Sequence, residues 1–162
     1  MSLEKLKEKD ASEFRIGKLI TMIARGHSFY LNHRLEELNI NASQLHNLFE
    51  VKHASKINQD EIARRCNLDK GSVARTVKKL EDKGLILKEI DENNRRQNQI
   101  SLTEKGEWVI EESSKILEEW ENEIFGQIDD GRKEELQKFL KETVIKTISV
   151  NKYLKRRESE GK

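Results

Sequence analysis

The residues best placed to do chemistry lie in the stretch NLDKGSVARTVKKLEDKGL, residues 67–85. Val73, Val77 and Leu80 recur at helical spacing, so they define one apolar face that must be buried. The opposite face then carries short, hydroxyl or basic side chains, namely Gly71, Ser72, Arg75, Thr76 and Lys79. The stretch therefore predicts a short helix whose outer face is rich in hydrogen-bond donors.

This outer face has the chemistry that reads a DNA major groove. Arg75 can donate two hydrogen bonds to a guanine, and Thr76 can meet a thymine methyl group or a phosphate. Gly71 and Ser72 are small enough to let the helix approach the groove. Backbone phosphates can be neutralised by the lysines of the stretch, which are Lys70, Lys78 and Lys79. An ordinary solvated basic helix face is the alternative reading.

The residues before this helix have the pattern of a helix-turn-helix. Asn58 can cap a short helix that runs to about Cys66, and Ala63 is small where a second helix would cross it. Asn67 lies where a turn residue tolerant of positive φ is wanted. Leu68 should then join the apolar contacts that hold the two helices at an angle.

A two-stranded hairpin is predicted directly after Gly84, which should end the outer-face helix. Residues 85–90 and 99–102 have strand character, and 91–97 form a polar turn between them. The tip of this hairpin is expected to contact DNA through Asn94, Arg95, Arg96 and Gln97. An arginine at such a tip can enter the narrow minor groove, where the potential is strongly negative. An ordinary solvated turn is again the alternative.

Longer helices must position these elements. We expect one helix over residues 11–38, and another over 42–54 that is capped by Asn41 with Gln44 three residues later. Thr103 should cap a further helix, and a break at 129–131 should precede a last helix with regularly spaced aliphatic residues. The predicted fold is therefore mainly α with a small β-hairpin wing, a winged helix-turn-helix.

Composition limits the class of protein. The 162 residues are 38% charged and 35% hydrophobic, with no proline and one cysteine. Residues 64–80 carry a net charge of +5, and residues 104–135 carry a net charge of −8. The basic and acidic residues are therefore expected on separate surfaces. No apolar run is long enough to span a membrane, and the N-terminus does not resemble a secretory signal. A single cysteine is typical of a reducing compartment, so we expect a cytoplasmic protein.

Enzymatic activity is not expected. There is no nucleophile elbow, phosphate-binding loop or dinucleotide fingerprint in the sequence. His27 and His33 are six residues apart, and His46 and His53 seven, so neither pair has the i, i+4 spacing of a two-histidine metal site. We therefore expect no metal and no cofactor. Cys66 is expected at a buried position with a packing role.

The sequence resembles the MarR family of transcriptional regulators. The resemblance rests on residues 58–63, on 72–75 with 80–86, and on Arg95-Arg96 leading into 102–106. The wing pattern of that family is Asp-x-Arg, six residues before Leu-Thr. Arg96 occupies the arginine position, but Asn94 stands where the family usually has the aspartate that braces this arginine. An amide accepts a hydrogen bond more weakly than a carboxylate, so the brace is weakened.

The resemblance implies a homodimer with interlocking first and last helices. Residues 1–38 would form the N-terminal dimerisation helix, 39–103 the DNA-binding domain, and 104–162 a connecting helix and a C-terminal dimerisation helix. It also implies a repressor of a pseudo-palindromic operator, released by a small aromatic or phenolic acid in a pocket. His27, Tyr30 and Trp108 are the candidate pocket residues, with packing roles as the alternative. The rival function is a winged-helix assembly module that binds an acidic protein.

Overall fold

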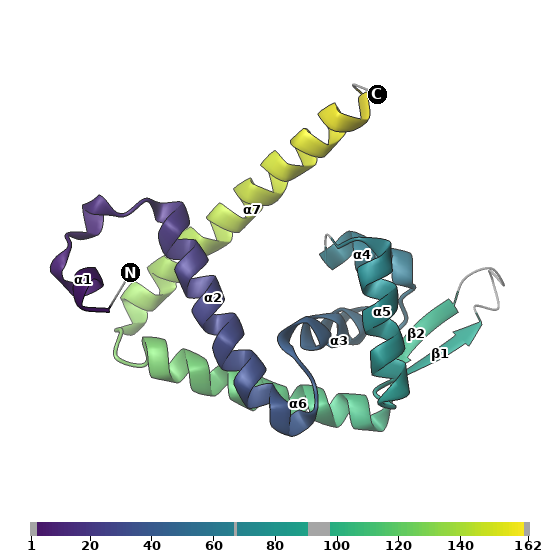
Figure 1. Cartoon of the computed structure of the whole chain (residues 1–162). Coiled ribbons are helices and arrows are strands. Elements are labelled where there is room, and N and C mark those ends of the chain that lie inside the picture. The colour runs from purple at the N-terminus through teal and green to yellow at the C-terminus, as the bar shows by residue number, and fades with distance from the viewer. Residues whose placement is uncertain (1–2, 67, 91–97, 161–162) are drawn as a thin grey trace. The chain divides into compact units, whose positions relative to one another are not determined.

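The computed structural model describes residues 3–66, 68–90 and 98–160 (Figure 1). Its elements follow the predicted order from residue 11 onward, and the short helix before them was not predicted. Two 3₁₀ helices, Ala11–Glu13 and Glu36–Leu38, flank α2. The α-helices and strands are α1 (Leu3–Glu8), α2 (Ile16–Leu35), α3 (Ala42–Ala54), α4 (Gln59–Cys66), α5 (Lys70–Asp82), β1 (Ile86–Ile90), β2 (Asn98–Leu102), α6 (Glu104–Phe125) and α7 (Asp130–Glu160).

The winged helix-turn-helix is built from α3, α4, α5 and the hairpin. Strands β1 and β2 pair antiparallel, with Ile86 opposite Leu102 and Ile90 opposite Asn98. One residue outside the hairpin extends this sheet, because Ile57 exchanges both backbone hydrogen bonds with Ile100 of β2, at 3.2 and 2.7 Å. The hairpin is thereby tied to the segment between α3 and α4, a pairing that the sequence pattern did not predict.

Several predicted helix caps are confirmed. The Asn41 side chain accepts from the Gln44 backbone N–H at 2.9 Å, and the Gln44 side chain accepts from the Asn41 backbone N–H. The two hydrogen bonds form a capping box. Asn58 accepts from the Glu61 backbone N–H at 2.9 Å. Gly84 has a φ of +68°, which glycine adopts without strain, and it ends the α5 segment as expected.

The prediction of one helix over residues 11–38 is wrong at its start. The first residues form a separate 3₁₀ turn, because Asp10 and Glu13 make their own capping box there. Phe14 and Arg15 are then extended, and α2 begins only at Ile16. At the other end α2 stops at Leu35 and a 3₁₀ helix continues to Leu38. Asn39 then adopts a left-handed φ of +54°, which ends the helical segment where the prediction placed its end.

The start of α6 is fastened to the segment that follows α5. The Thr103 hydroxyl donates to the Gly84 carbonyl at 2.7 Å and accepts from the Gly106 N–H at 3.0 Å. The Lys105 ammonium donates to the Lys83 carbonyl at 2.9 Å. A Cβ atom added to Gly106 would lie 2.1 Å from the Leu85 carbonyl oxygen, far inside van der Waals contact. Only glycine allows this approach of α6 to the start of β1.

Gly106→Ala should therefore lower the free energy of unfolding by about 1–3 kcal/mol or more, because the clash is with backbone and cannot be relieved by a side-chain rotation. Urea unfolding followed by circular dichroism measures this loss. Glu111→Ala, at an exposed position of the same helix, is the control and should change stability by less than about 0.5 kcal/mol. Equal stability of the two variants would contradict the close approach.

The chain divides into two compact units, Met1–Glu118 and Glu119–Lys162. The first holds the core, whose fully buried members include Leu35, Leu48, Ile62 and Leu80. The second contains α7, which carries exposed aliphatic and aromatic side chains along most of its length. These are Phe139, Leu140, Val144, Ile145, Ile148, Val150, Tyr153 and Leu154, all 45–60% exposed.

Candidate nucleic-acid interface

Helix α5 has the two faces that its sequence predicts. Val73 and Leu80 are fully buried and Val77 is 1% exposed, so this face packs into the winged-helix core. The predicted contact residues lie away from that face: Lys70, Gly71, Arg75, Lys78 and Lys79 are exposed, while Ser72 and Thr76 are half-buried at its edge. The structure therefore brings all seven onto one helix with a basic outer surface.

Local hydrogen bonds stabilise the first turns of α5, which carry part of this basic surface. The Asp69 carboxylate accepts from the Ser72 backbone N–H at 2.8 Å, and hydrogen bonds from Ser72 lower the pKa of Asp69 below its usual value. The Arg75 guanidinium donates to the Ser72 hydroxyl at 2.9 Å. The Thr76 hydroxyl donates to the Ser72 carbonyl at 3.0 Å, which leaves its oxygen able to accept and its methyl group free to make apolar contacts.

The lysines of α5 differ in their partners. Lys70 lies 2.9 Å from an Asp60 carboxylate oxygen, and Lys78 lies 2.7 Å from one of Asp82. Both pairs are solvent-exposed, so each is weak and is readily exchanged for a phosphate. The Asp82 pairing and the nearby Glu81 raise the pKa of Lys78. Sequence reasoning left out Ala74, which is exposed on the other flank of the helix and is small enough to contact a thymine methyl group.

The helix-turn-helix itself is close to the prediction, with one correction. Ala63 is 5% exposed, as expected of a small residue at a helix crossing. Leu68 was predicted to pack between the helices, but it is 41% exposed. Its main contribution is instead a backbone hydrogen bond, from its N–H to the Ala63 carbonyl at 3.0 Å. Asn67, the predicted turn residue, lies outside the described residues.

The end of α5 is tied to the end of the α2 segment by Lys83. Its ammonium donates to the Asn39 carbonyl and, at 3.1 Å, to the Gln44 side-chain oxygen. Burial and the nearby Lys79 lower the pKa of Lys83. Gln44 is only 3% exposed, so this contact lies at the edge of the core. The orientation of α5 is thus fixed against α3 by a charge-assisted contact that motif reasoning did not predict.

The hairpin tip is not part of the described structure. Asn94, Arg95, Arg96 and Gln97 fall within residues 91–97, so their assignment as DNA contacts stays a prediction. The described strands place the ends of that turn at Ile90 and Asn98, which are paired with each other.

Comparison with known proteins decides the family. A model described as the MarR family matches residues 40–97. The crystal structure of a MarR transcriptional regulator from Methanosarcina mazei Go1 is 30% identical, with a TM-score of 0.78 over 83% of this chain and 97% of that chain. The chain belongs to the MarR family. The MarR family is one of DNA-binding transcriptional regulators, not of enzymes, so the basic outer face of α5 lies on a DNA-binding fold.

Two further MarR-type structures agree with this assignment. A crystal structure of MarR is 28% identical, with a TM-score of 0.79 over 89% of this chain and 97% of that chain. The S. aureus MepR–DNA complex is 24% identical, with a TM-score of 0.73 over 82% and 98% of the two chains, and shares the fold. No helix in the described part of this MarR-family chain is long and apolar enough to cross a membrane.

The candidate effector residues of this MarR-family protein lie on two helices. His27 and Tyr30 are half-buried on α2, and Trp108 is 52% exposed on α6. The Tyr30 hydroxyl accepts from Arg34 at 2.9 Å, so it already has a protein partner. An open hollow of about 600 Å³ is lined by residues that follow His27 in the chain, but it includes none of the three candidates. Its lining residues are Ser28, Asn32, Glu36, Ile40, Asn41, Ala42 and Ser43.

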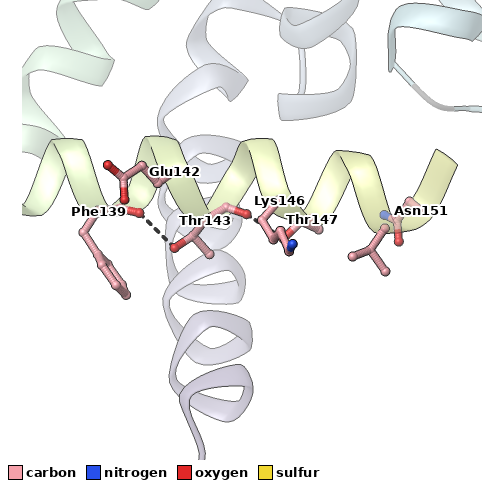
Figure 2. Close-up of a pocket in the computed structure, with 7 residues that line it drawn as sticks. Phe139, Glu142, Thr143, Lys146, Thr147 and Asn151 are labelled. Atoms are coloured by element: carbon pink, nitrogen blue, oxygen red, sulfur yellow. Dashed lines mark hydrogen bonds between the residues drawn. The ribbon is translucent and has the colours of Figure 1, made fainter. Parts of the chain in front are cut away.

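A second hollow, of about 460 Å³, lies along one side of α7 (Figure 2). All of its lining residues come from that helix: Phe139, Glu142, Thr143, Lys146, Thr147, Val150 and Asn151. Figure 2 shows the Thr143 hydroxyl turned back onto the Phe139 carbonyl, to which it donates at 2.8 Å. Because one helix forms every wall, this feature is the surface of an uncovered helix and not an enclosed ligand site.

Cys66 differs from its prediction in position and surroundings. It is half-buried at the end of α4, not fully buried, although it does pack against the core. Partial burial, with the negative charge of Glu50, raises the pKa of the Cys66 thiol. Glu50 and His46 are its neighbours on α3. The i, i+4 spacing of His46 and Glu50 is present in the sequence, but the spacing of the histidines alone does not reveal it.

Proposed function

We propose that this MarR-family protein is a homodimeric repressor that binds a pseudo-palindromic operator and releases it when a small molecule binds. The observation that carries the DNA-binding part is the outer face of α5, where Arg75 and Lys79 are exposed opposite a fully buried aliphatic face. S. aureus MepR, which shares the fold, has been crystallised with DNA. In a two-fold dimer, two such helices would read half-sites about 10 base pairs apart.

Arg75 is the side chain that we propose reads a base. Its guanidinium is exposed and donates to the neutral Ser72 hydroxyl, and the Asp69 carboxylate is near enough for the Arg75 charge to help lower the pKa of Asp69. A neutral partner of this kind is easily exchanged, because a bidentate bond to guanine is stronger than one neutral hydrogen bond. The paired lysines, Lys70 and Lys78, are then expected to contact phosphates and to carry little sequence information.

Arg75→Ala should weaken binding to the best operator by about 1–3 kcal/mol and relax preference at one base pair of each half-site. Gel shifts with the operator and with single-base variants measure both effects. Arg132→Ala is the control, because it removes the same charge from an exposed position of α7. An equal loss on every sequence would show that Arg75 contacts only the backbone.

A salt series on genomic fragments tests the function itself. Specific binding that falls steeply with salt supports the regulator, because each released counterion steepens the dependence. Absence of any shift at low salt would instead support an assembly module that binds an acidic protein. Sequencing of the bound fragments would identify the operator and its neighbouring gene.

The effector part of the proposal rests on the family resemblance and on the half-buried positions of His27 and Tyr30. A planar aromatic or phenolic acid suits a lining of aromatic rings with one imidazole. Salicylate at millimolar concentration should raise the melting temperature and quench tryptophan fluorescence. If it does neither, and the operator complex is also unaffected, the aromatic-acid effector is wrong.

A further inference from the structure

We infer that His46, Glu50 and Cys66 form a site for a zinc-type divalent metal ion, which joins α3 to the end of α4. Each residue offers one ligand atom, and these atoms all lie within 4.8 Å of one another. The site is separate from the outer face of α5 and from the candidate effector residues. It therefore adds a binding activity to the proposed function and does not depend on it.

Helix geometry brings two of the ligands together. His46 and Glu50 are four residues apart on α3, so their side chains project from neighbouring turns of the same face. Cys66 is the last residue of α4, which packs against α3. The third ligand therefore comes from a different helix, and a metal ion bound to all three would cross-link the two.

The donor atoms select the class of metal. A thiolate sulfur, an imidazole nitrogen and a carboxylate oxygen together suit Zn²⁺ and similar transition-metal ions, whereas Mg²⁺ and Ca²⁺ prefer oxygen donors alone. With bonds of about 2.0–2.3 Å, tetrahedral zinc ligands lie roughly 3–4 Å apart. The present limit of 4.8 Å between ligand atoms exceeds that spacing by only about 1–2 Å. Three protein ligands leave the fourth position to water.

Neighbouring charges do not block the site. The Arg65 guanidinium lies 3.9 Å from one Glu50 oxygen, but its shorter contact is to Glu61, at 3.0 Å. Glu61 can therefore hold Arg65 while Glu50 turns to a metal ion. A divalent cation among the three ligands would neutralise the negative charges of the Glu50 carboxylate and a Cys66 thiolate. Binding then releases the thiol proton to solvent.

Cobalt is a direct probe of this site. We expect the reduced, metal-free full-length protein to bind one Co²⁺ per chain and to gain the near-ultraviolet absorption band of a cobalt–thiolate bond. Zn²⁺ should remove the band by displacing cobalt. Cys66→Ser should abolish the band, and His46→Ala and Glu50→Gln should each weaken cobalt binding by about tenfold or more, since loss of even an outer partner costs 10–100-fold.

His53→Ala is the matched control. His53 lies on the same helix, but its ring stacks on Phe49 with centroids 6.4 Å apart, and it is not a member of the cluster. Its removal should leave cobalt binding unchanged. Absence of the thiolate band in the full chain, or an equal loss in His53→Ala and His46→Ala, would overturn the site. His46 is exposed, so its removal should not disturb folding and the comparison holds even if Cys66→Ser unfolds.

Discussion

Leu80→Ala should lower the free energy of unfolding by about 2–5 kcal/mol. Leu80 is fully buried on the inner face of α5, and its carbonyl accepts the backbone N–H of Leu85 at 3.0 Å, where the chain turns toward the hairpin. Removing three carbon atoms there leaves a cavity in the core. Fixed helices can close such a cavity only in part, so both the lost burial and the residual void destabilise the fold.

Urea unfolding followed by circular dichroism measures this effect. Leu87→Ala is the matched control, because it deletes the same atoms from a β1 side chain that is 54% exposed. That control should change the free energy of unfolding by less than about 1 kcal/mol. If both substitutions cost the same, Leu80 does not occupy the buried position assigned to it.

Placing two charges on the apolar face of α7 should convert the proposed dimer to a monomer and weaken operator binding by about 10²–10⁴-fold. Leu140, Val144 and Ile148 are four residues apart and 45–55% exposed, so they share a face that the described part of the chain leaves exposed. A face of this kind on one helix indicates an interface. Leu140→Glu with Ile148→Glu would bury unpaired carboxylates in that interface.

Sedimentation at micromolar concentration measures the association, and gel shifts measure its effect on DNA. Lys138→Gln with Lys146→Gln is the control, because it changes the net charge by the same amount at exposed positions of α7 that lie outside the row of Leu140, Val144 and Ile148. The control should remain a dimer. A charged variant that also stays a dimer would place the interface elsewhere, and removal of the chain from Leu136 onward should then leave association intact as well.

The elements of the winged helix could be predicted because local signals agree with the tertiary fold. Asn41 and Asn58 each cap the helix that their spacing predicted, and Gly84 ends the α5 segment as predicted. The helical spacing of the apolar residues in α5 correctly predicted which face of the helix is buried. Where a local cap competed with a longer apolar pattern, as at Asp10, the cap determined the structure and the predicted long helix was wrong.

Contacts between distant residues could not be predicted in the same way. Nothing local to Ile57 indicates that it pairs with Ile100, and nothing local to Lys83 indicates that its ammonium reaches Asn39. The cluster of His46, Glu50 and Cys66 could not be predicted for the same reason, because one of its three members comes from a second helix. The exposure of Leu68 also depends on the angle between α4 and α5, and the spacing of apolar residues in the sequence does not predict that angle.

The attachment of α6 to the end of α5 also has a consequence for the order of folding. Thr103, Lys105 and Gly106 contact residues 83–85 about 20 positions earlier, and Ile57 pairs with Ile100 about 40 positions later. Each contact closes a long loop before it contributes stability, so none can form early by local search. Helices α3 to α5 should therefore pack together first. The hairpin should reach its final position late in folding, when the first turn of α6 packs against it.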